Sequence, residues 1–378
     1  MLTELTVENY RGFERYRLPE LRRVNLLVGR NNCGKTSLLE AVRLFARKGY
    51  PDDLKYIALD RGEVTFVDEP ERPEGGRYFP AVSHFFRNRQ FQLGQELVIQ
   101  GSESELLRIS VSTFDSVDTS GDYEELVQQL LRRSSSPTET LLWSEFACAT
   151  KVASIFAIPL STKGTIGFPT GPGRPRWAAM QTDGHTVSTN VEFISPGSLE
   201  PMLMGEMWDW AVETGDEESV VDAMKLLEPR LQSIHFLSAE HMYRHSRSGV
   251  LLGFEGERRR VPLGSHGDGM RRMLALALSL THTSGGYLLV DEIDTGLHWT
   301  VMADMWRLVI ETARRNNTQV FATTHSLDCL RGLDQACREY PHLAEDVSAH
   351  TIDPTLEESV FMSAGDLRIA LEQEIEVR

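Results

Sequence analysis

The sequence lacks the long apolar runs of a membrane protein and the paired cysteines of a disulfide-rich or zinc-binding one. No stretch of eighteen apolar residues occurs, so we expect no transmembrane helix. The start, Met1–Val7, alternates like a β-strand, whereas a signal peptide needs a basic stretch followed by an apolar block. The four cysteines form no CxxC pair, and a disulfide at Cys33 would obstruct the glycine-rich loop that contains it. These absences predict a cytoplasmic protein in a reducing compartment.

Positive charge is also scarce. The chain has 39 Lys and Arg against 55 Asp and Glu, a formal net charge of −16. Binding to duplex DNA depends on many Lys and Arg contacts to phosphates, so a broad DNA-coating surface is disfavoured. Basic clusters at Arg258–Arg260 and Arg271–Arg272 leave room only for a confined groove. Nucleic acid therefore stays an open alternative and is not the expected main partner.

The two ends of the chain show the clearest secondary-structure patterns. Residues 1–30 predict three strands, the last being the apolar run Val24–Val28, and residues 37–47 change to helical spacing. Residues 50–115 look β-rich and irregular. The middle, residues 116–210, is the hardest to interpret, with a short helix expected near 124–133 and a loop at 171–175. It has no heptad repeat, so we expect no coiled-coil arm.

From residue 217 onward, helices alternate with short buried strands. The expected helices span about 218–232, 270–280 and 299–314, and the expected strands span 234–237, 249–254, 287–290 and 319–323. This alternation predicts an α/β fold with a mainly parallel sheet.

A strand, a glycine-rich turn and a helix surround the motif Gly29–Thr36, which fits G-x-x-x-x-G-K-[ST], the Walker A pattern. Its backbone N–H groups and the helix N-terminus suit phosphate oxygens. Lys35 is expected to neutralise the β- and γ-phosphates of ATP, and the Thr36 hydroxyl to bind Mg²⁺. A chance glycine turn before a helix is the alternative, and the flanking pattern disfavours it. The candidate nucleotide-binding residues here are Gly29, Arg30, Asn31, Asn32, Cys33, Gly34, Lys35, Thr36 and Ser37.

Two later strands end in polar residues that suit ATP hydrolysis. The apolar run Leu288–Val290 is followed by Asp291, expected at the Mg²⁺, and Glu292, expected as general base for the attacking water. The strand Phe321–Thr324 is followed by His325, which could contact the γ-phosphate or orient the water. Alone, each is a common strand ending. Together with the phosphate loop, they predict catalytic roles for Glu292, His325 and Lys35.

A second glycine-rich segment, Gly264–Gly269, precedes the helix expected at 270–280. A helix-capping turn would explain it equally well in isolation. In a head-to-tail dimer, however, such a segment would clamp the γ-phosphate held by the partner's phosphate loop. The candidate residues are Ser265, Gly267, Asp268 and Gly269.

This order of motifs resembles that of ABC-class ATPases. The ending Asp291–His298 is similar to the branch that contains RecF-like, SMC-like and OLD-type proteins, and not to transporter ATPases. With Gly264–Gly269 and Phe321–Ser326, the chain resembles stand-alone AAA-domain, OLD-like bacterial ATPases over about residues 1–48 and 230–378. The resemblance implies an ABC-class P-loop ATPase head with a mainly parallel sheet, flanking helices, an antiparallel β subdomain and an inserted region.

Two positions depart from the family's pattern. Either Ser265 with Gly267 or Gly267 with Gly269 could face the partner's phosphate, and both pairings stay open. The glutamine that senses magnesium is not identifiable, with Gln90 and Gln92 as candidates only by location. OLD-type nucleases also carry a C-terminal TOPRIM domain of on the order of a hundred residues. The stretch after His325 is shorter, so we expect no nuclease activity in this chain.

We therefore expect an ATP-hydrolysing enzyme that uses ATP and Mg²⁺ and dimerises or forms a higher homo-oligomer through composite ATP sites. The resemblance implies control of a separately encoded effector, a nuclease or toxin, in bacterial anti-phage defence. The alternatives are a RecF- or SMC-like DNA-repair ATPase and a nucleotide-sensing scaffold that does not hydrolyse. The expected domains are an N-terminal ATPase lobe at 1–115, an insertion at 116–210 and a C-terminal ATPase lobe at 211–378.

Overall fold

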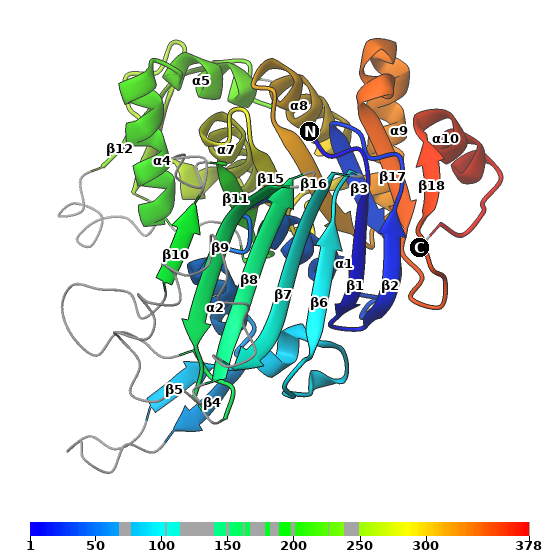
Figure 1. Cartoon of the computed structure of the whole chain (residues 1–378). Helices are drawn as coiled ribbons and strands as arrows, with labels where there is room; N and C mark the ends of the chain where they lie inside the picture. The colour runs from blue at the N-terminus through cyan, green and yellow to red at the C-terminus, as the bar shows by residue number, and fades with distance from the viewer. Residues whose placement is uncertain are drawn as a thin grey trace.

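The fold is layered, with helices between two sheets and more helices outside one of them (Figure 1). The structure is a computed structural model, and it describes residues 1–67, 77–102, 104–113, 140–148, 151–161, 163–166, 178–181, 189–197, 201–225, 227–237 and 249–377. No helix in these ranges has the length and apolar character needed to span a bilayer.

The first layer is a seven-stranded antiparallel sheet with the order β10-β9-β8-β7-β6-β1-β2. Each strand pairs antiparallel with its neighbours. The strands are β1 (Leu5–Tyr10), β2 (Phe13–Leu18), β6 (Glu96–Gln100), β7 (Glu105–Thr113), β8 (Thr140–Cys148), β9 (Lys151–Pro159) and β10 (Ala178–Gln181).

The second sheet has six strands in the order β11-β15-β16-β3-β17-β18, and all pairs except β17 with β18 are parallel. Its strands are β3 (Val24–Val28), β11 (Val191–Ile194), β15 (Tyr287–Val290), β16 (Gln319–Thr324), β17 (Val347–Thr351) and β18 (Val360–Ser363). The strands that carry the predicted motifs are therefore near neighbours, and their carboxyl ends meet at one edge of the sheet.

Alternation along the central strands explains why both faces of this sheet are covered. Leu27 and Phe321 face a core shared with the antiparallel sheet, whereas Leu26 and Val320 face a second core. Successive side chains in a strand point to opposite faces, so these apolar strands need a cover on each side. Helix α1 (Lys35–Ala46) packs in the first core, between the sheets. The helices of the second core are α4 (Pro201–Thr214), α5 (Glu217–Lys225), α7 (Gly267–His282), α8 (Met302–Arg315), α9 (Leu327–Glu339) and α10 (Ala364–Glu372).

Smaller elements complete the described parts of the chain. A three-stranded sheet comprises β12 (Leu231–Phe236), β13 (Val250–Phe254) and β14 (Val261–Pro262), and a hairpin comprises β4 (Val64–Val67) and β5 (Arg77–Pro80). The 3₁₀ helices are η1 (Val82–Phe85), η2 (Arg87–Arg89), η5 (Leu263–His266), η6 (Trp299–Val301) and η7 (Pro341–Asp346).

The predicted fold class is confirmed: the chain is α/β, with a mainly parallel sheet and an antiparallel one. One part of the expectation for residues 50–115 is wrong, because helix α2 (Pro51–Asp60) lies there. Pro51 occupies the first turn, where its missing N–H costs nothing, and acidic residues follow it. Leu54, Ile57 and Ala58 then form a buried stripe at helical spacing.

Two expected helix boundaries are also wrong. The helix expected at 218–232 ends at Lys225, and Leu231 instead begins β12, where it pairs with Phe254. The helix expected from Met270 begins at Gly267, so the second glycine-rich segment spans η5 and the first turn of α7.

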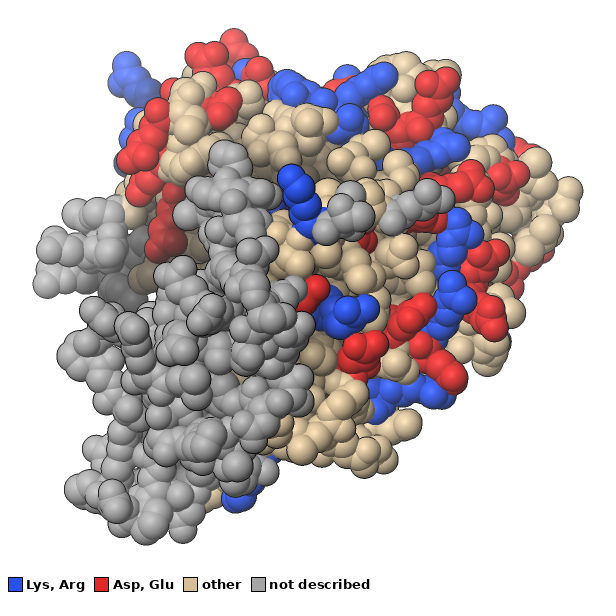
Figure 2. All heavy atoms as spheres, in the orientation of Figure 1, with Lys and Arg blue, Asp and Glu red and all other residues tan. Residues whose placement is uncertain are grey.

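The segment expected as an insertion contributes to both sheets. Strands β8 and β9 continue the antiparallel sheet from β7, and β11 pairs parallel with β15. The helix expected near 124–133 and the loop expected at 171–175 lie outside the described residues. Basic and acidic side chains are interspersed over the described surface that faces the viewer in Figure 2, where no broad basic area is seen.

Candidate functional site

The phosphate loop connects the carboxyl end of β3 to the N-terminus of α1, and its glycines are required by its shape. Gly34 has φ +100°, and a Cβ atom there would lie 2.4 Å from Cζ of Phe13. Gly29 has φ +149°, and a Cβ atom would lie 2.7 Å from the carbonyl oxygen of Ile352. Only glycine adopts such conformations without strain and leaves this room. The loop therefore presents its backbone to a ligand without a side chain in the way.

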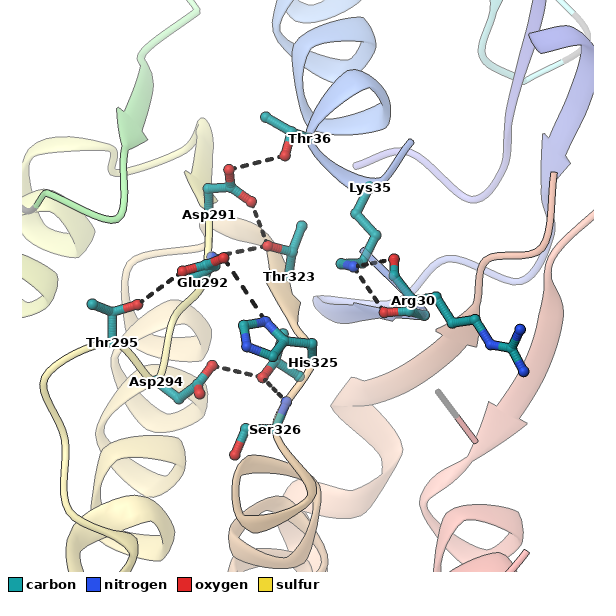
Figure 3. A network of polar contacts seen from close by, with 12 residues as sticks. Arg30, Lys35, Thr36, Asp291, Glu292, Asp294, Thr295, Thr323, His325 and Ser326 are labelled. Atoms are coloured by element: carbon teal, nitrogen blue, oxygen red, sulfur yellow. Dashed lines mark hydrogen bonds and ion pairs between the residues drawn. The ribbon is translucent and has the colours of Figure 1, made fainter. Parts of the chain in front are cut away.

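Lys35 is buried and fixed by its own loop. Its Nζ donates hydrogen bonds to the carbonyl oxygens of Gly29 at 2.8 Å and Arg30 at 2.9 Å. The ammonium group is thus held at the mouth of the loop, where it can move to a phosphate by exchanging these partners. The Arg30 side chain instead extends away from the other labelled residues (Figure 3).

Thr36 and Asp291 join the phosphate loop to the end of β15. The Thr36 hydroxyl donates to Oδ2 of Asp291 at 2.9 Å, across 255 positions of sequence. The Thr323 hydroxyl, from β16, donates to Oδ1 of Asp291 at 2.5 Å. One hydroxyl and one carboxylate in direct contact are oxygen ligands of the kind that Mg²⁺ prefers.

Glu292 lies beside this pair in a strained backbone conformation, with φ +47°. Its carboxylate accepts a hydrogen bond from the Thr295 hydroxyl at 3.3 Å and lies 3.8 Å from Nδ1 of His325 (Figure 3). The Glu292 and His325 side chains are 40% and 50% exposed. A carboxylate and an imidazole in contact at an open surface can take a proton from water or orient it.

Thr324 and Ser326 arrange the residues that follow β16. The Thr324 hydroxyl donates to Asp294 at 2.6 Å and accepts from the backbone N–H of Ser326 at 3.0 Å. Ser326 then caps α9 by accepting from the N–H of Cys329. His325 is therefore held between two fixed residues.

The second glycine-rich segment stands apart from the phosphate loop of its own chain. All of Gly264–Asp268 is exposed, and no hydrogen bond or ion pair within the described ranges joins it to Gly29–Thr36. Gly269 packs instead against the residues after β15: a Cβ atom there would lie 3.4 Å from the carbonyl oxygen of Gly296.

Arg272 follows this segment on α7 and is 2% exposed, although the sequence grouped it with Arg271 in a basic cluster. Its guanidinium donates to the carbonyl oxygens of Ser195 at 2.8 Å, Asp291 at 3.0 Å and Glu292 at 3.0 Å. Burial lowers the pKa of Arg272 to about 10, so the group stays charged at neutral pH.

A polar cavity of about 510 Å³ opens beside the phosphate loop. Phe13, Asn32, Gly34 and Ser37 line it together with residues from η1 and η2. An ion-pair cluster forms one wall, in which Arg11 pairs with Glu40 at 2.8 Å and Glu63 at 2.6 Å, and Arg61 pairs with Glu40. Paired charges of this kind hold a wall rigid without leaving a buried charge uncompensated.

The structure brings five of the predicted residues to one place, namely Lys35, Thr36, Asp291, Glu292 and His325. It leaves Ser265, Gly267 and Asp268 outside that group. Three residues that contact the site, Thr323, Arg272 and Ser195, are not among those predicted from the sequence. Thr323 could have been found as a second polar residue at the end of β16, whereas the other two contact the site only through the tertiary fold.

The chain matches two family models over separate stretches, and a distant relative over 90% of its length. Residues 1–90 match a model described as "AAA ATPase domain", and residues 204–330 match one described as "AAA domain, putative AbiEii toxin, Type IV TA system". An ATP/GTP phosphatase of Helicobacter pylori is 19% identical over 359 residues, which is 90% of this chain and 89% of that protein.

Two of the solved structures that match align with nearly the whole chain, at TM-scores below 0.5. An SMC head bound to the C-winged helix domain of ScpA gives a TM-score of 0.47 at 12% identity, covering 96% of this chain and 98% of that one. An Smc head with an extended coiled coil, bound to the C-terminal domain of ScpA from Pyrococcus furiosus, gives 0.46 at 10% identity, covering 99% of each chain.

The two matched models lie on the two halves of the site. The phosphate loop falls within residues 1–90, and the Asp291–Glu292 strand falls within residues 204–330. Contact between Thr36 and Asp291 joins these halves at one sheet edge. Over these two stretches the chain is similar to P-loop ATPases of the AAA type, and the two stretches carry the two halves of one site.

Proposed function

We propose that this chain is an ATP-driven switch that dimerises or oligomerises around ATP and controls a separately encoded effector. Two copies pair head to tail, so that the segment Ser265–Gly269 of one closes on the phosphate loop of the other. Hydrolysis then separates them. The output is a conformational change that gates a nuclease or toxin in anti-phage defence.

The proposed chemistry assigns a task to each residue gathered at the sheet edge. Lys35 exchanges its loop carbonyls for the β- and γ-phosphates. Thr36 and Asp291 hold Mg²⁺, which supplies charge neutralisation at the phosphates. Glu292 accepts the proton of the attacking water, and His325 orients that water and the Glu292 carboxylate. The nucleoside occupies the 510 Å³ cavity beside the loop.

The exposure of both halves of the site is the observation that supports oligomerisation. Glu292 and His325 are 40% and 50% exposed, and the residues of Gly264–Asp268 are exposed. Stabilising the charge of phosphoryl transfer works best where water is excluded. A second copy would exclude water by covering Glu292 and His325 with its own Ser265–Gly269 segment. Residues 1–115 and 211–378 then act as the two lobes of each ATP site.

The family model over residues 204–330, whose description names a putative toxin of a type IV toxin–antitoxin system, supports a role in such a system. Such systems contain a separately encoded partner. The Helicobacter pylori relative, named as an ATP/GTP phosphatase, supports hydrolysis and makes GTP a second nucleotide to try.

The sizing experiment compares Glu292→Gln with the wild type and with Glu311→Gln, a matched surface change on α8. If Glu292 is the general base, Glu292→Gln should bind ATP without turnover, so we expect its mass to double or rise further with ATP and Mg²⁺ but not with ADP. The Glu311→Gln protein should behave like the wild type. An unchanged mass of Glu292→Gln across all nucleotides contradicts the composite site.

The effect of duplex DNA on the rate of ATP hydrolysis distinguishes this proposal from the DNA-repair alternative. The exposed cluster Arg258–Arg260 is the feature that favours the alternative. With a net charge of −16, we expect duplex DNA to leave the rate of phosphate release unchanged at about 150 mM salt, where weak phosphate contacts are screened. A large stimulation by DNA would favour the alternative instead.

A further inference from the structure

Two side chains from outside its own strand hold the dipeptide Asp291–Glu292 at four points, three on its backbone and one on the Asp291 carboxylate. The dipeptide joins the carboxylate proposed to hold Mg²⁺ to the carboxylate proposed as general base. Glu292 has φ +47°, a left-handed conformation that is uncommon for residues other than glycine. Such conformations persist where the surrounding contacts over-determine them, and they occur often at functional sites.

Thr323 supplies two of the four points with a single hydroxyl. Its Oγ1 donates to Oδ1 of Asp291 at 2.5 Å and accepts from the backbone N–H of Glu292 at 2.9 Å (Figure 3). Thr323 is fully buried, so water cannot replace these bonds. The hydroxyl therefore fixes the Asp291 carboxylate and the direction of the Glu292 backbone together.

Arg272 supplies the other two points from helix α7. Its Nη2 donates to the carbonyl oxygens of both Asp291 and Glu292 at 3.0 Å, while Nη1 anchors on the carbonyl oxygen of Ser195. The planar guanidinium has its donors in a fixed arrangement, which an ammonium group cannot reproduce. Within the described part of the chain its Nε has no hydrogen-bond partner, so the three carbonyl oxygens are the groups that compensate the burial of this guanidinium.

We propose that Arg272 and Thr323 are positioning residues that clamp the Asp291–Glu292 peptide and so aim the Glu292 carboxylate at the attacking water. This rests on the function proposed above. Because Arg272 lies one turn after Gly269 on α7, the clamp also connects Glu292 to the segment on which the second copy closes. Movement of that segment is passed to Glu292 through α7 and Arg272.

The clamp predicts a loss in catalysis without an equal loss in nucleotide binding. Within the described residues neither side chain hydrogen-bonds to the phosphate loop, so ATP affinity measured without Mg²⁺ should change less than about 2-fold, while misdirection of a catalytic group costs far more. We expect kcat to fall about 10-fold in Thr323→Val and about 100-fold in Arg272→Met. Thr323→Ser, which keeps the hydroxyl, should recover most of the activity.

Matched controls separate positioning from loss of stability. Thr318→Val removes a fully buried hydroxyl directly before the first residue of the same strand, where it donates to the carbonyl oxygen of Thr283. Arg338→Met breaks an ion pair to the buried Asp334 far along the chain. Both variants should lower the melting temperature and leave kcat within about 2-fold of the wild type.

The double variant Arg272→Met/Thr323→Val tests whether the two residues act on one peptide. Independent effects would multiply to a fall of about 1000-fold in kcat, whereas a shared clamp leaves the double variant near the about 100-fold of Arg272→Met alone. Multiplicative effects, or a Thr323→Val protein as active as Thr318→Val, would overturn the clamp. If Arg272→Met does not fold, Arg272→Lys takes its place. The comparison of Thr323→Val with Thr323→Ser still tests the clamp.

Glu292→Gln measured in parallel shows which proposal has failed. If it loses turnover and the clamp variants do not, the clamp is wrong and the ATPase assignment of Glu292 stands. If Glu292→Gln turns over ATP at the wild-type rate, the role of Glu292 is wrong, and the clamp fails with it.

Discussion

Protonation of His350 should make the folded protein less stable as the pH falls below neutrality. His350 is fully buried on β17, where its two ring nitrogens contact the hydroxyls of Ser359 at 3.0 Å and Ser348 at 3.1 Å. Burial lowers its pKa to about 4. The unfolded chain, with a histidine pKa of about 6.5, therefore binds the proton first.

The sign and size of the effect follow from proton linkage. Between the two pKa values the unfolded state holds more protons, so the stability from His350 is complete above about pH 6.5 and is lost as the pH falls toward 4. Between pH 7 and pH 5 the unfolding free energy should drop by about 2 kcal/mol on account of this residue. The Ser348 hydroxyl donates to Asn25 on β3, so protonation of His350 should also weaken the packing of the strand that leads to the phosphate loop.

Urea unfolding at pH 7, 6 and 5 measures this loss, with His350→Gln as the comparison. The variant keeps a hydrogen-bonding side chain that does not titrate, so its constant loss of stability cancels when only the change with pH is compared. We expect the wild type to lose about 2 kcal/mol more than the variant over this range. Parallel curves for the two proteins would refute the reasoning.

Two further predictions concern the phosphate loop. Gly34→Ala should lower the unfolding free energy by about 2 kcal/mol and abolish ATP binding, because the new Cβ would clash with Phe13 at a position with φ +100°. Gly365→Ala should be tolerated, because the atom nearest to its new Cβ is 3.6 Å away. Melting curves and nucleotide titrations of the two variants test this difference. Thr36→Val should lose most of the Mg²⁺ activation of phosphate release, by about 100-fold, while Thr36→Ser keeps it and EDTA silences the wild type. Normal Mg²⁺ dependence in Thr36→Val would exclude Thr36 as a ligand.

The sequence was sufficient for the parts of the site that are encoded locally. Gly34, Lys35 and Thr36 stand in one short motif, and the apolar run before Asp291 shows that this residue ends a buried strand. Fold class followed from the alternation of strands and helices, which is a local property. In each case, the residues that determine the structure lie within a few positions of one another.

What the sequence could not show depends on distant segments. Arg272 looks like part of a surface cluster because its three carbonyl partners, at Ser195, Asp291 and Glu292, come from other elements. Helix α2 was missed because its buried stripe is short and follows a proline. Strands β8 and β9 carry no functional motif, and only their pairing with β7 shows that they extend the antiparallel sheet.

The position of β16 explains why its ending, Thr323–Ser326, supplies most of the contacts at the site, although such a strand ending is common in isolation. This strand lies between β3, which leads to the phosphate loop, and β15, which leads to Asp291. Its register places Ala322 opposite Val290 and Thr324 opposite Val28, so Thr323 points to Asp291 at the junction of the two. A shift of one residue would turn Thr323 to the other face of the sheet. The run Thr323–Ser326 therefore requires each residue type at its own place, since Thr323 holds Asp291, Thr324 holds Asp294 and Ser326 caps α9.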